Sequence, residues 1–485
     1  MMVANEISID IRVLKMAHDL AAAGPRVTLL GLSPSSDREY FSLGQANVIR
    51  LPHGRQITPS GVPARNPYAP ILRLIETTRG WPRVPGRLAR GFLWLLIKTA
   101  RALRSPIRKA RGVSLRLRSK WADLMFGVRP RGDWRVALPQ LTNLETVFGP
   151  ELDALAPDVI HAQDVHLLGV GARAVERASL EGRKALLIYD SHEYVQGLAT
   201  FSPRLVAAWA ALEREYIGRA DRVITVSPAI AELLVTDYQV DPPPVVVLNI
   251  PPVGGQPAVS IREATGLGLD EPLLVYSGGV SQMRGLHTLV AALGRLDGVH
   301  LALIIPAVYK YVLDLEEMAR VGGYEERLHL LPYVEPQDVV GFLASATVAV
   351  SPIVSGPINH ETTLPNKIFE YMHARLPIVI SDCKAMSEFV EALGIGEVFV
   401  SEDVDSLTKT LTRVLGNLDH YRSVYRDHPE LFERYSWRTE RRKMFGVYQD
   451  LLGKEAVAAD IGGEGLTSLT EDQKTQVNHV GGGQT

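Results

Sequence analysis

Short runs of β-branched and other apolar residues alternate with helix-length segments along most of this chain. Apolar residues recur at helical spacing from Val13 to Leu20, and Gly24 and Pro25 end that predicted helix before the strand-like run 27–32. Further strand-like runs of the first half lie at 157–162, 185–190, 222–227 and 245–249. Alternation of this kind predicts parallel sheets whose faces are covered by helices.

A second series of the same kind follows an interruption. The motif PPVGGQP at 251–257 is typical of a linker. Strand-like runs then recur at 273–276, 300–305, 328–331, 347–350, 378–380 and 398–400. Since 485 residues exceed what one compact core usually holds, we predict two doubly wound α/β halves. The predicted organisation is an N-terminal domain at 1–250 with a basic insertion at about 60–135, a C-terminal domain at 251–434, an amphipathic helix at 435–453 and a disordered tail at 454–485.

The start of the chain is unusual for this class of fold. Only Met2–Ala4 precede the predicted loop 5–10, where a strand of about five or six residues is expected. The first strand is therefore either very short or begins upstream of this sequence.

Composition excludes several classes of protein. A net charge of −2 is too small for a surface that coats nucleic acid or membrane as a whole, so any such contact must be local. The single cysteine, Cys383, cannot form an intramolecular disulfide, and the chain lacks the paired Cys and His spacing of a structural zinc site. Because we find neither an apolar run of about 18 residues nor a signal-peptide pattern, we expect a cytoplasmic protein.

One segment is strongly basic. Residues 77–122 carry thirteen Lys or Arg and no acidic residue, and the apolar run 91–97 lies among them. Contact with an anionic membrane is one interpretation, because the apolar run would anchor in lipid while the basic side chains face lipid phosphates. A disordered basic loop and a nucleic-acid patch are the alternatives. The segment lacks the interleaved aromatic residues typical of nucleic-acid binding, and we expect no nucleic-acid partner.

Glycines follow the first strand-like run of the second half. The segment 276–280 (YSGGV) comes after a predicted strand and before the helix expected from Leu286. Here Gly278 and Gly279 would let backbone N–H groups approach a phosphate closely, and Arg284 would add a fixed positive charge. By spacing alone, an ordinary strand-to-helix turn with a surface arginine explains the same residues.

A second candidate is the helix start within 364–372 (LPNKIFEYM). Pro365 favours a first helical turn, in which Asn366 and Lys367 would present unpaired backbone N–H groups. Glu370 lies one turn later, where a carboxylate can bridge the two hydroxyls of a ribose. The alternative is an amphipathic core helix with Glu370 in a solvated row.

Several ordered motifs together resemble one family. PNKIFEYMHARLPIVISD looks like the signature segment of retaining glycosyltransferase family 4, and YSGGVSQMRGLHTLVAAL looks like its phosphate-binding turn. Upstream, PDVIHAQDVHLLGVGA, LIYDSHEY and ADRVITVSPAIAELL follow the order and spacing of this family. The resemblance implies a GT-B fold of two facing Rossmann-like domains, with the donor nucleotide held by the C-terminal domain and the acceptor mainly by the N-terminal one. It also implies that the helix at 435–453 crosses back to the N-terminal domain.

The resemblance assigns roles to individual residues. Glu370 is expected to bind the donor ribose. Arg284, which stands where the family usually has Lys, would hold the diphosphate with help from Lys367 and the N–H groups near Asn366. His192, in the segment DSHE, matches the family's HE element and would contact the transferred sugar.

The acceptor side and the chemistry follow from the same resemblance. Asp10 and Arg12 lie where an acceptor would be met, together with His192. The reaction needs stabilisation of the departing diphosphate, which cations and helix N-termini supply, so we expect no metal and no cofactor besides the nucleotide sugar itself. The family retains the anomeric configuration, and no protein nucleophile is required.

Two positions depart from the family pattern. The family usually has a Glu eight residues before the ribose-binding one; that position is Thr362 here, with Glu361 beside it. Gly279 stands where the family commonly has an Arg. Thr362 and Gly279 remain predicted donor contacts, but the identity of the donor sugar is left open.

Polar residues after two strands of the first half allow more than one interpretation. His161, Asp164 and His166 are close in sequence, and we interpret them as a polar loop at the rim of a cleft rather than a metal cluster. Asp190 and Glu193 flank His192 and would orient it; Asp190 as a helix N-cap is the alternative.

The predicted function is a retaining glycosyltransferase that uses a UDP- or GDP-linked sugar. Its acceptor would be a glycan or a lipid-linked molecule in the synthesis of a cell-envelope or extracellular polysaccharide at the inner face of the plasma membrane. A non-catalytic protein of the same fold that binds nucleotide sugar or membrane as a scaffold is one alternative. A nucleotide-sugar epimerase is the other.

Overall fold

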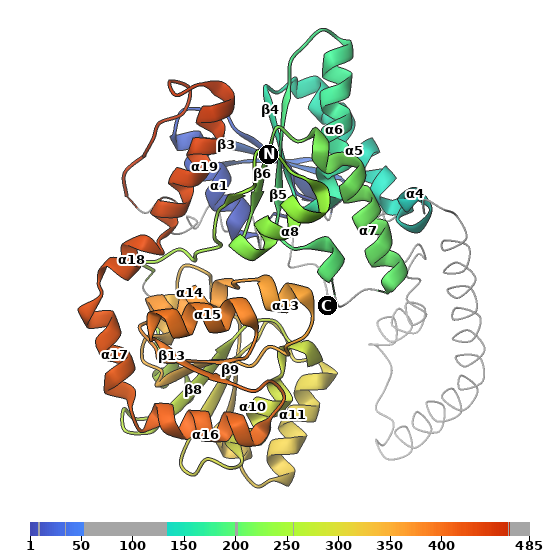
Figure 1. The fold of residues 1–485 in the computed structure, drawn as a ribbon. Coiled ribbons are helices and arrows are strands. Elements are labelled where there is room, and N and C mark those ends of the chain that lie inside the picture. Colours follow the sequence, from blue (N-terminus) through green and yellow to red (C-terminus); the bar gives the residue numbers. More distant parts are fainter. Residues whose placement is uncertain are drawn as a thin grey trace, which may run out of the picture.

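The computed structural model describes residues 1–465 apart from 8–9, 34, 53–132, 199–201, 256 and 464. Two α/β halves face each other, with the N-terminal half above the C-terminal half in Figure 1, and the predicted α/β class is confirmed. The basic segment 77–122 and nearly all of the predicted insertion at 60–135 lie outside the described residues. No helix within the described ranges is both long enough and apolar enough to cross a bilayer.

The N-terminal half is built on one sheet in two parts. β4 (Val159–Gln163), β5 (Leu186–Ser191), β6 (Arg222–Thr225) and β7 (Val245–Val246) pair in parallel, as do β1 (Thr28–Ser33) and β3 (Ala46–Pro52). Met2 joins the two parts, because it forms parallel bridges with both Leu30 of β1 and Ala162 of β4. The first strand, expected at Met2–Ala4, is thus reduced to one bridging residue.

A hairpin that the alternating runs did not predict forms one edge of this sheet. β2 (Glu39–Leu43) pairs antiparallel with β3, so the N-terminal sheet is mixed rather than purely parallel. Gly44, with φ +57°, begins the two-residue turn between the strands. Two short runs separated by a glycine-led pair are the sequence signal for such a hairpin.

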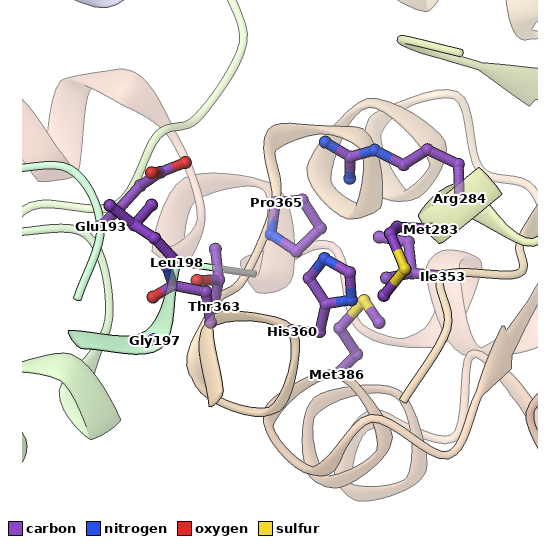
Figure 2. Close-up of a pocket in the computed structure, with 11 residues that line it drawn as sticks. Glu193, Gly197, Leu198, Met283, Arg284, Ile353, His360, Thr363, Pro365 and Met386 are labelled. Atoms are coloured by element: carbon purple, nitrogen blue, oxygen red, sulfur yellow. The ribbon is translucent and has the colours of Figure 1, made fainter. Parts of the chain in front are cut away.

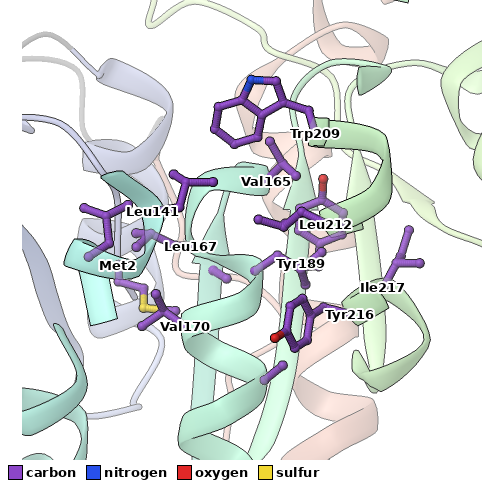
Figure 3. Close-up of a cluster of buried hydrophobic side chains, with 14 of the residues drawn as sticks. Met2, Leu141, Val165, Leu167, Val170, Tyr189, Trp209, Leu212, Tyr216 and Ile217 are labelled. Atoms are coloured by element: carbon purple, nitrogen blue, oxygen red, sulfur yellow. The ribbon is translucent and has the colours of Figure 1, made fainter. Parts of the chain in front are cut away.

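Helices cover both faces of the N-terminal sheet. Figure 3 shows side chains of α6 and α7 gathered around Tyr189 of β5 in one of the two cores. The second core packs α1 against the opposite face. The helices of this half are α1 (Ile11–Ala22), α4 (Trp134–Ala137), α5 (Pro139–Leu155), α6 (Val165–Leu180), α7 (Pro203–Tyr216) and α8 (Pro228–Tyr238), with short 3-10 turns η1 (Val195–Gly197) and η2 (Ile217–Arg219).

The C-terminal half contains a six-stranded parallel sheet in the order β10-β9-β8-β11-β12-β13. Its strands are β8 (Leu273–Ser277), β9 (His300–Ile304), β10 (Leu328–Leu331), β11 (Val348–Ser351), β12 (Ile378–Ser381) and β13 (Gly396–Phe399). The chain runs outward from β8 in one direction and from β11 in the other. The carboxyl ends of β8 and β11 therefore border a crevice of the kind in which open α/β sheets bind ligands.

Helices also cover both faces of this second sheet, one core lying on each face. They are α9 (Ile261–Thr265), α10 (Leu286–Leu293), α11 (Lys310–Val321), α12 (Val339–Leu343), α13 (Ile358–Thr362), α14 (Asn366–His373), α15 (Lys384–Leu393), α16 (Val404–Leu415) and α17 (Leu418–Asp427), with 3-10 turns η3 (Gln282–Arg284) and η4 (Glu325–Arg327).

The last helices return to the N-terminal half. After α18 (Glu430–Arg434), α19 (Trp437–Leu452) lies beside α1 (Figure 1), and Trp437, Phe445 and Tyr448 are buried in the same core as Val13 of α1. The chain thus crosses between the halves twice, once on the way out and once on the way back.

The expectation of a disordered tail from residue 454 is wrong for its first part. Val457 is buried, and the backbone N–H of Ala458 donates to the carbonyl of Ala23 at 2.9 Å. The carboxylate of Asp460 accepts hydrogen bonds from three arginines of α19, at 438, 441 and 442. Composition alone cannot reveal this packing, because the arginines that hold the segment lie in the preceding helix.

Two hydrogen bonds connect the halves beside the crevice. The N–H of Tyr194 donates to Asn359 Oδ1 at 2.9 Å, and Ser227 Oγ donates to the carbonyl of Thr362 at 2.7 Å. Both acceptors belong to α13, so this short helix is the part of the C-terminal half that touches the N-terminal half here.

Candidate functional site

The turn after β8 is held in a fixed conformation by its own residues. Gly278 has φ +155°, and a side chain there would begin 3.0 Å from the hydroxyl of Tyr276. That hydroxyl donates to the carbonyl of Gly279 at 2.7 Å. Position 279 does not require a glycine for steric reasons, because a Cβ atom there would meet nothing within 4 Å.

Arg284 follows this turn at the end of η3. The next residue, Gly285, has φ +66°, and a Cβ atom there would lie 1.9 Å from the carbonyl oxygen of Pro352, which follows β11. The absence of a side chain at Gly285 therefore lets the η3 segment pack directly on the end of β11. The guanidinium of Arg284 makes no hydrogen bond or ion pair with any residue that the structure describes.

Helix α14 carries the other predicted donor-binding residues. Lys367 Nζ donates to both carboxylate oxygens of Glu370, at 3.0 and 3.1 Å, and Asn366 Nδ2 approaches one of them at 3.3 Å. The side chain of Glu370 is only 5% exposed. Burial raises the pKa of Glu370, and the charge of Lys367 only partly opposes that rise. The predicted alternative of a solvated Glu370 is therefore wrong.

The turn and the helix meet at the carboxyl end of β8. The hydroxyl of Tyr371 in α14 accepts a hydrogen bond from the N–H of Ser277 at 3.0 Å. A Cβ atom at Gly278 would lie 3.7 Å from Lys367 Cε. The structure thus brings Gly278, Lys367 and Glu370 together, although the contacting residues Ser277 and Tyr371 are 94 positions apart in the chain.

A cleft of about 380 Å³ opens between the halves next to this cluster (Figure 2). Arg284 and Pro365 border it from the C-terminal half, and Glu193 borders it from the N-terminal half. The cleft is also lined by Gly197, Leu198, Met283, Ile353, Asn359, His360, Thr363 and Met386. These eight residues were not predicted; the position of Ile353 just after β11 was the available signal, because ligand crevices lie at strand ends.

Thr362 does not take the place predicted for it. Its hydroxyl donates to the carbonyl of Ile358 in its own helix, and its carbonyl faces Ser227. Its neighbour Thr363 lines the cleft instead. Glu361 is also occupied, because its carboxylate accepts hydrogen bonds from the backbone N–H groups of Gly356 and Lys384.

His192 lies at the carboxyl end of β5, directly before the cleft residue Glu193. Its Nε2 atom is 2.9 Å from Gln163 Oε1 and 3.5 Å from Asp190 Oδ2, and 20% of its side chain is exposed. Burial disfavours a charged ring, but the carboxylate of Asp190 outweighs burial and raises the pKa of His192.

Arg12 is not available to an acceptor, contrary to the prediction. Its guanidinium donates to both carboxylate oxygens of Asp190, at 2.9 and 3.1 Å, and to the carbonyl of Val247 at 2.9 Å. Both partners of this ion pair are buried. Asp10 instead begins α1, where its carboxylate accepts from the N–H of Val13.

Asp190 is part of this buried pair and not a helix N-cap. Burial would raise the pKa of Asp190, but Arg12 and His192 hold it far below its ordinary range. The N-cap alternative is wrong because Asp190 lies within β5, and the orienting role remains.

His161, Asp164 and His166 do not converge on one point. His161 is buried within β4, whereas Asp164 caps the start of α6 and His166 packs its ring against Trp209 with 4.5 Å between ring centres. The predicted rim loop is therefore wrong for His161. No group of three His, Cys, Asp or Glu side chains in the described ranges could hold a metal ion.

Comparisons with known proteins match both halves. A family model described as "Glycosyl transferases group 1" matches residues 271–417, and one described as "Glycosyltransferase Family 4" matches residues 126–249. An uncharacterized glycosyltransferase of Methanocaldococcus jannaschii is 22% identical over 193 residues, which are 39% of this chain and 48% of that protein. The match therefore spans about half the length of this curated relative.

Solved structures share the fold. Sucrose-phosphate synthase from Thermosynechococcus elongatus has a TM-score of 0.64 and 15% identity, covering 93% of this chain and 98% of its own. HepE of Anabaena, solved in complex with UDP, has a TM-score of 0.51 and 17% identity, covering 64% of this chain and 82% of its own. At 15% and 17% identity, the similarity to these two structures shows a shared fold.

Proposed function

Because the chain belongs to the group 1 glycosyltransferases and has the GT-B fold, we propose that it transfers a sugar from a nucleotide-sugar donor to a glycan or lipid-linked acceptor. The observation that carries this proposal is Arg284. An arginine without a protein partner among the described residues borders a cleft at the switch point of a parallel sheet, beside a glycine turn. Such a side chain suits a ligand that brings its own negative charge.

The diphosphate of the donor would occupy the space between Arg284 and the start of α14. The N–H groups of Asn366 and Lys367 precede the first intrahelical bonds of α14, so they are free to face an anion. As the glycosyl bond breaks, negative charge grows on the leaving diphosphate, and fixed donors of this kind stabilise it. Glu370, buried beside Lys367, would accept hydrogen bonds from the ribose hydroxyls.

The sugar would lie toward His192 and Glu193. We propose that the reaction retains the anomeric configuration by attack from the face that the diphosphate leaves, without a protein nucleophile or a metal. Gln163 and Asp190 contact His192 at its Nε2 atom, and the ring is partly exposed, so the rest of the ring can meet a sugar hydroxyl.

Donor and acceptor classes are part of the same proposal. The complexes of Anabaena HepE with UDP and with UDP-glucose favour a UDP-linked donor over a GDP-linked one. We propose an acceptor in cell-envelope or extracellular polysaccharide synthesis, reached from the cytoplasm with peripheral membrane contact through residues 77–122.

The test is donor binding and turnover with matched arginine variants. The stability of the protein is measured with UDP, GDP, ADP and their sugar conjugates; a ligand at about a hundredfold excess over its Kd adds about 2.7 kcal/mol. Arg284→Ala should abolish most of this gain and lower turnover of the donor about a hundredfold or more. Arg284→Lys should restore much of both, and Arg320→Ala, in an exposed pair with Glu317, should change neither.

The contrary results are specific. No stabilisation by any nucleotide, with Arg284→Ala behaving as the wild type, would favour a non-catalytic scaffold. Release of an epimerised nucleotide sugar, rather than free or transferred sugar, would identify an epimerase.

A further inference from the structure

A chain of buried polar side chains runs from α19 to His192 behind the cleft. Tyr448 of α19 lies 2.8 Å from His161 Nδ1, and His161 Nε2 lies 3.2 Å from Gln163 Nε2. Gln163 Oε1 is then 2.9 Å from His192 Nε2. Tyr448, His161 and Gln163 are buried, so water cannot substitute for any of these contacts.

The chemistry of each group fixes the direction of the chain. Burial lowers the pKa of His161 to about 3, so its ring is neutral and carries a single N–H. The amide of Gln163 has a donor end and an acceptor end. If its NH₂ group donates to His161 Nε2, then His161 Nδ1–H donates to Tyr448, and Gln163 Oε1 must accept Nε2–H of His192.

The opposite orientation of the amide would require a bare nitrogen at His192 Nε2. Asp190 Oδ2 lies 3.5 Å from this atom, and a carboxylate so near favours a nitrogen that carries a proton. The same oxygen is 3.9 Å from His161 Nε2, which makes its influence there weaker. The position of Asp190 therefore selects the first orientation.

We propose that Gln163 is a positioning residue that holds His192 as its Nε2–H tautomer and leaves Nδ1 as a hydrogen-bond acceptor for a hydroxyl of the sugar substrates. At 2.9 Å, Gln163 makes the hydrogen bond, whereas 3.5 Å to Asp190 is at its limit. Nδ1 has no partner among the described residues. The tautomer of His192 follows from these contacts alone. Only the hydrogen bond from a sugar hydroxyl to Nδ1 rests on the proposed function.

A pH dependence follows with a defined sign. Protonation of His192 would place a proton on Nδ1 and turn the acceptor into a donor, so turnover should fall as pH falls through the raised pKa of His192. The titratable and charged groups that face this ring are Asp190 of β5, Arg12 of α1, Asp164 and His166 at the start of α6, His161 of β4 and Glu193.

The test is nitrogen-15 NMR of the histidine rings, which needs no substrate. The His192→Asn variant identifies the signals of His192. Above the pKa, the wild type should show a protonated Nε2 and a bare Nδ1 at His192. Gln163→Met, which keeps the length of the side chain, should give a mixture of tautomers and a turnover number about tenfold lower, with the low-pH limb displaced.

Two further variants separate positioning from general stability. Tyr448→Phe removes the acceptor of the His161 proton and should shift the His192 tautomer in the same direction, by less. Gln449 lies on the same helix as Tyr448, and Gln449→Met, which removes its hydrogen bond to the carbonyl of Val457, should leave the tautomer of His192 unchanged. A wild-type His192 with the proton on Nδ1, or a tautomer unaffected in both Gln163→Met and Tyr448→Phe, would overturn the proposal. If the tautomer shifts as expected but no nucleotide sugar is turned over, the proposed function fails and the positioning role stands.

Discussion

The two sides of the cleft are built in different ways. On the C-terminal side, the turn after β8 and the start of α14 supply Gly278, Arg284 and Glu370, each near a glycine or proline that marks its place in the sequence. On the N-terminal side, the charged residues Arg12 and Asp190 are 178 positions apart and form a buried pair with each other. The C-terminal side leaves Arg284 without a hydrogen bond or ion pair to a described residue, whereas the N-terminal side uses Arg12 and Asp190 to hold the sheet and His192 in place.

This difference teaches how far a polar residue after a strand indicates ligand binding. Such a residue in a doubly wound fold is available to a ligand only if the fold places no oppositely charged side chain within ion-pair distance of it. Arg284 makes no ion pair with a described residue, although Glu193 lies on the opposite wall of the same cleft, whereas Arg12 is paired with Asp190. The two arginines therefore make the sharpest test of the comparison.

The largest expected effect is on stability, at Arg12. Arg12→Met leaves Asp190 buried without its partner and should lower the free energy of unfolding by about 3–5 kcal/mol in urea titrations. The control is Arg135→Met, since Arg135 and its partner Glu215 are partly exposed and the loss there should be about 1 kcal/mol or less. Equal losses of unfolding free energy in Arg12→Met and Arg135→Met would contradict the structural role that we assign to the buried pair on the N-terminal side.

Gly285→Ala should have the next largest effect. Gly285 and Gly298 both have φ +66°, but a Cβ atom at Gly298 meets nothing within 4 Å, whereas at Gly285 it meets the carbonyl of Pro352 at 1.9 Å. Gly298→Ala should cost about 1–2 kcal/mol from the backbone conformation alone. Gly285→Ala should lower the free energy of unfolding by more than Gly298→Ala, and it should also weaken donor binding because Arg284 must move. An equal loss in the two variants would show that the structure around Pro352 adjusts to the added Cβ atom without cost.

The pH dependence of donor binding should reveal Glu370. Because burial raises the pKa of Glu370 above 4.5, its carboxylate is protonated, and loses acceptor capacity, at a pH where an exposed glutamate is still charged. Affinity for a nucleotide sugar, measured by calorimetry, should therefore fall as pH falls through that raised pKa, by up to about tenfold per pH unit. Glu370→Gln should bind more weakly at neutral pH and lack this limb; an identical limb in the variant would assign it to another group.

The smallest expected effect is a gain, at Gly279. Gly279→Arg adds a cation beside the proposed diphosphate site at a position with open space, so stability should not change and donor affinity should rise by up to about fivefold. Gly278→Ala, with its Cβ atom 3.0 Å from the Tyr276 hydroxyl, should weaken binding instead. A loss of stability in Gly279→Arg would show that the glycine there has a structural role.

The sequence predicted the elements that depend on local patterns. Each predicted strand of the C-terminal half forms, because alternating β-branched runs and helix-length segments specify a parallel sheet over short distances. Two features were missed for different reasons. The β2–β3 hairpin is local, but it does not follow the strand–helix alternation on which the prediction relied. The ordered residues 454–463 depend on arginines of α19, which their own composition cannot reveal.

The sequence by itself determined the fold class, the two halves, and the glycine turn and helix start that meet at β8, because glycine, proline and hydrophobic period act over a few neighbouring residues. Only the tertiary structure decided which charged groups remain for a ligand. It paired Arg12 with Asp190, turned Thr362 toward the other half and placed Gln163 behind His192. The physical reason is that desolvation makes an unpaired buried charge costly, so the partner that the fold delivers, and not the residue type, determines what each polar side chain does.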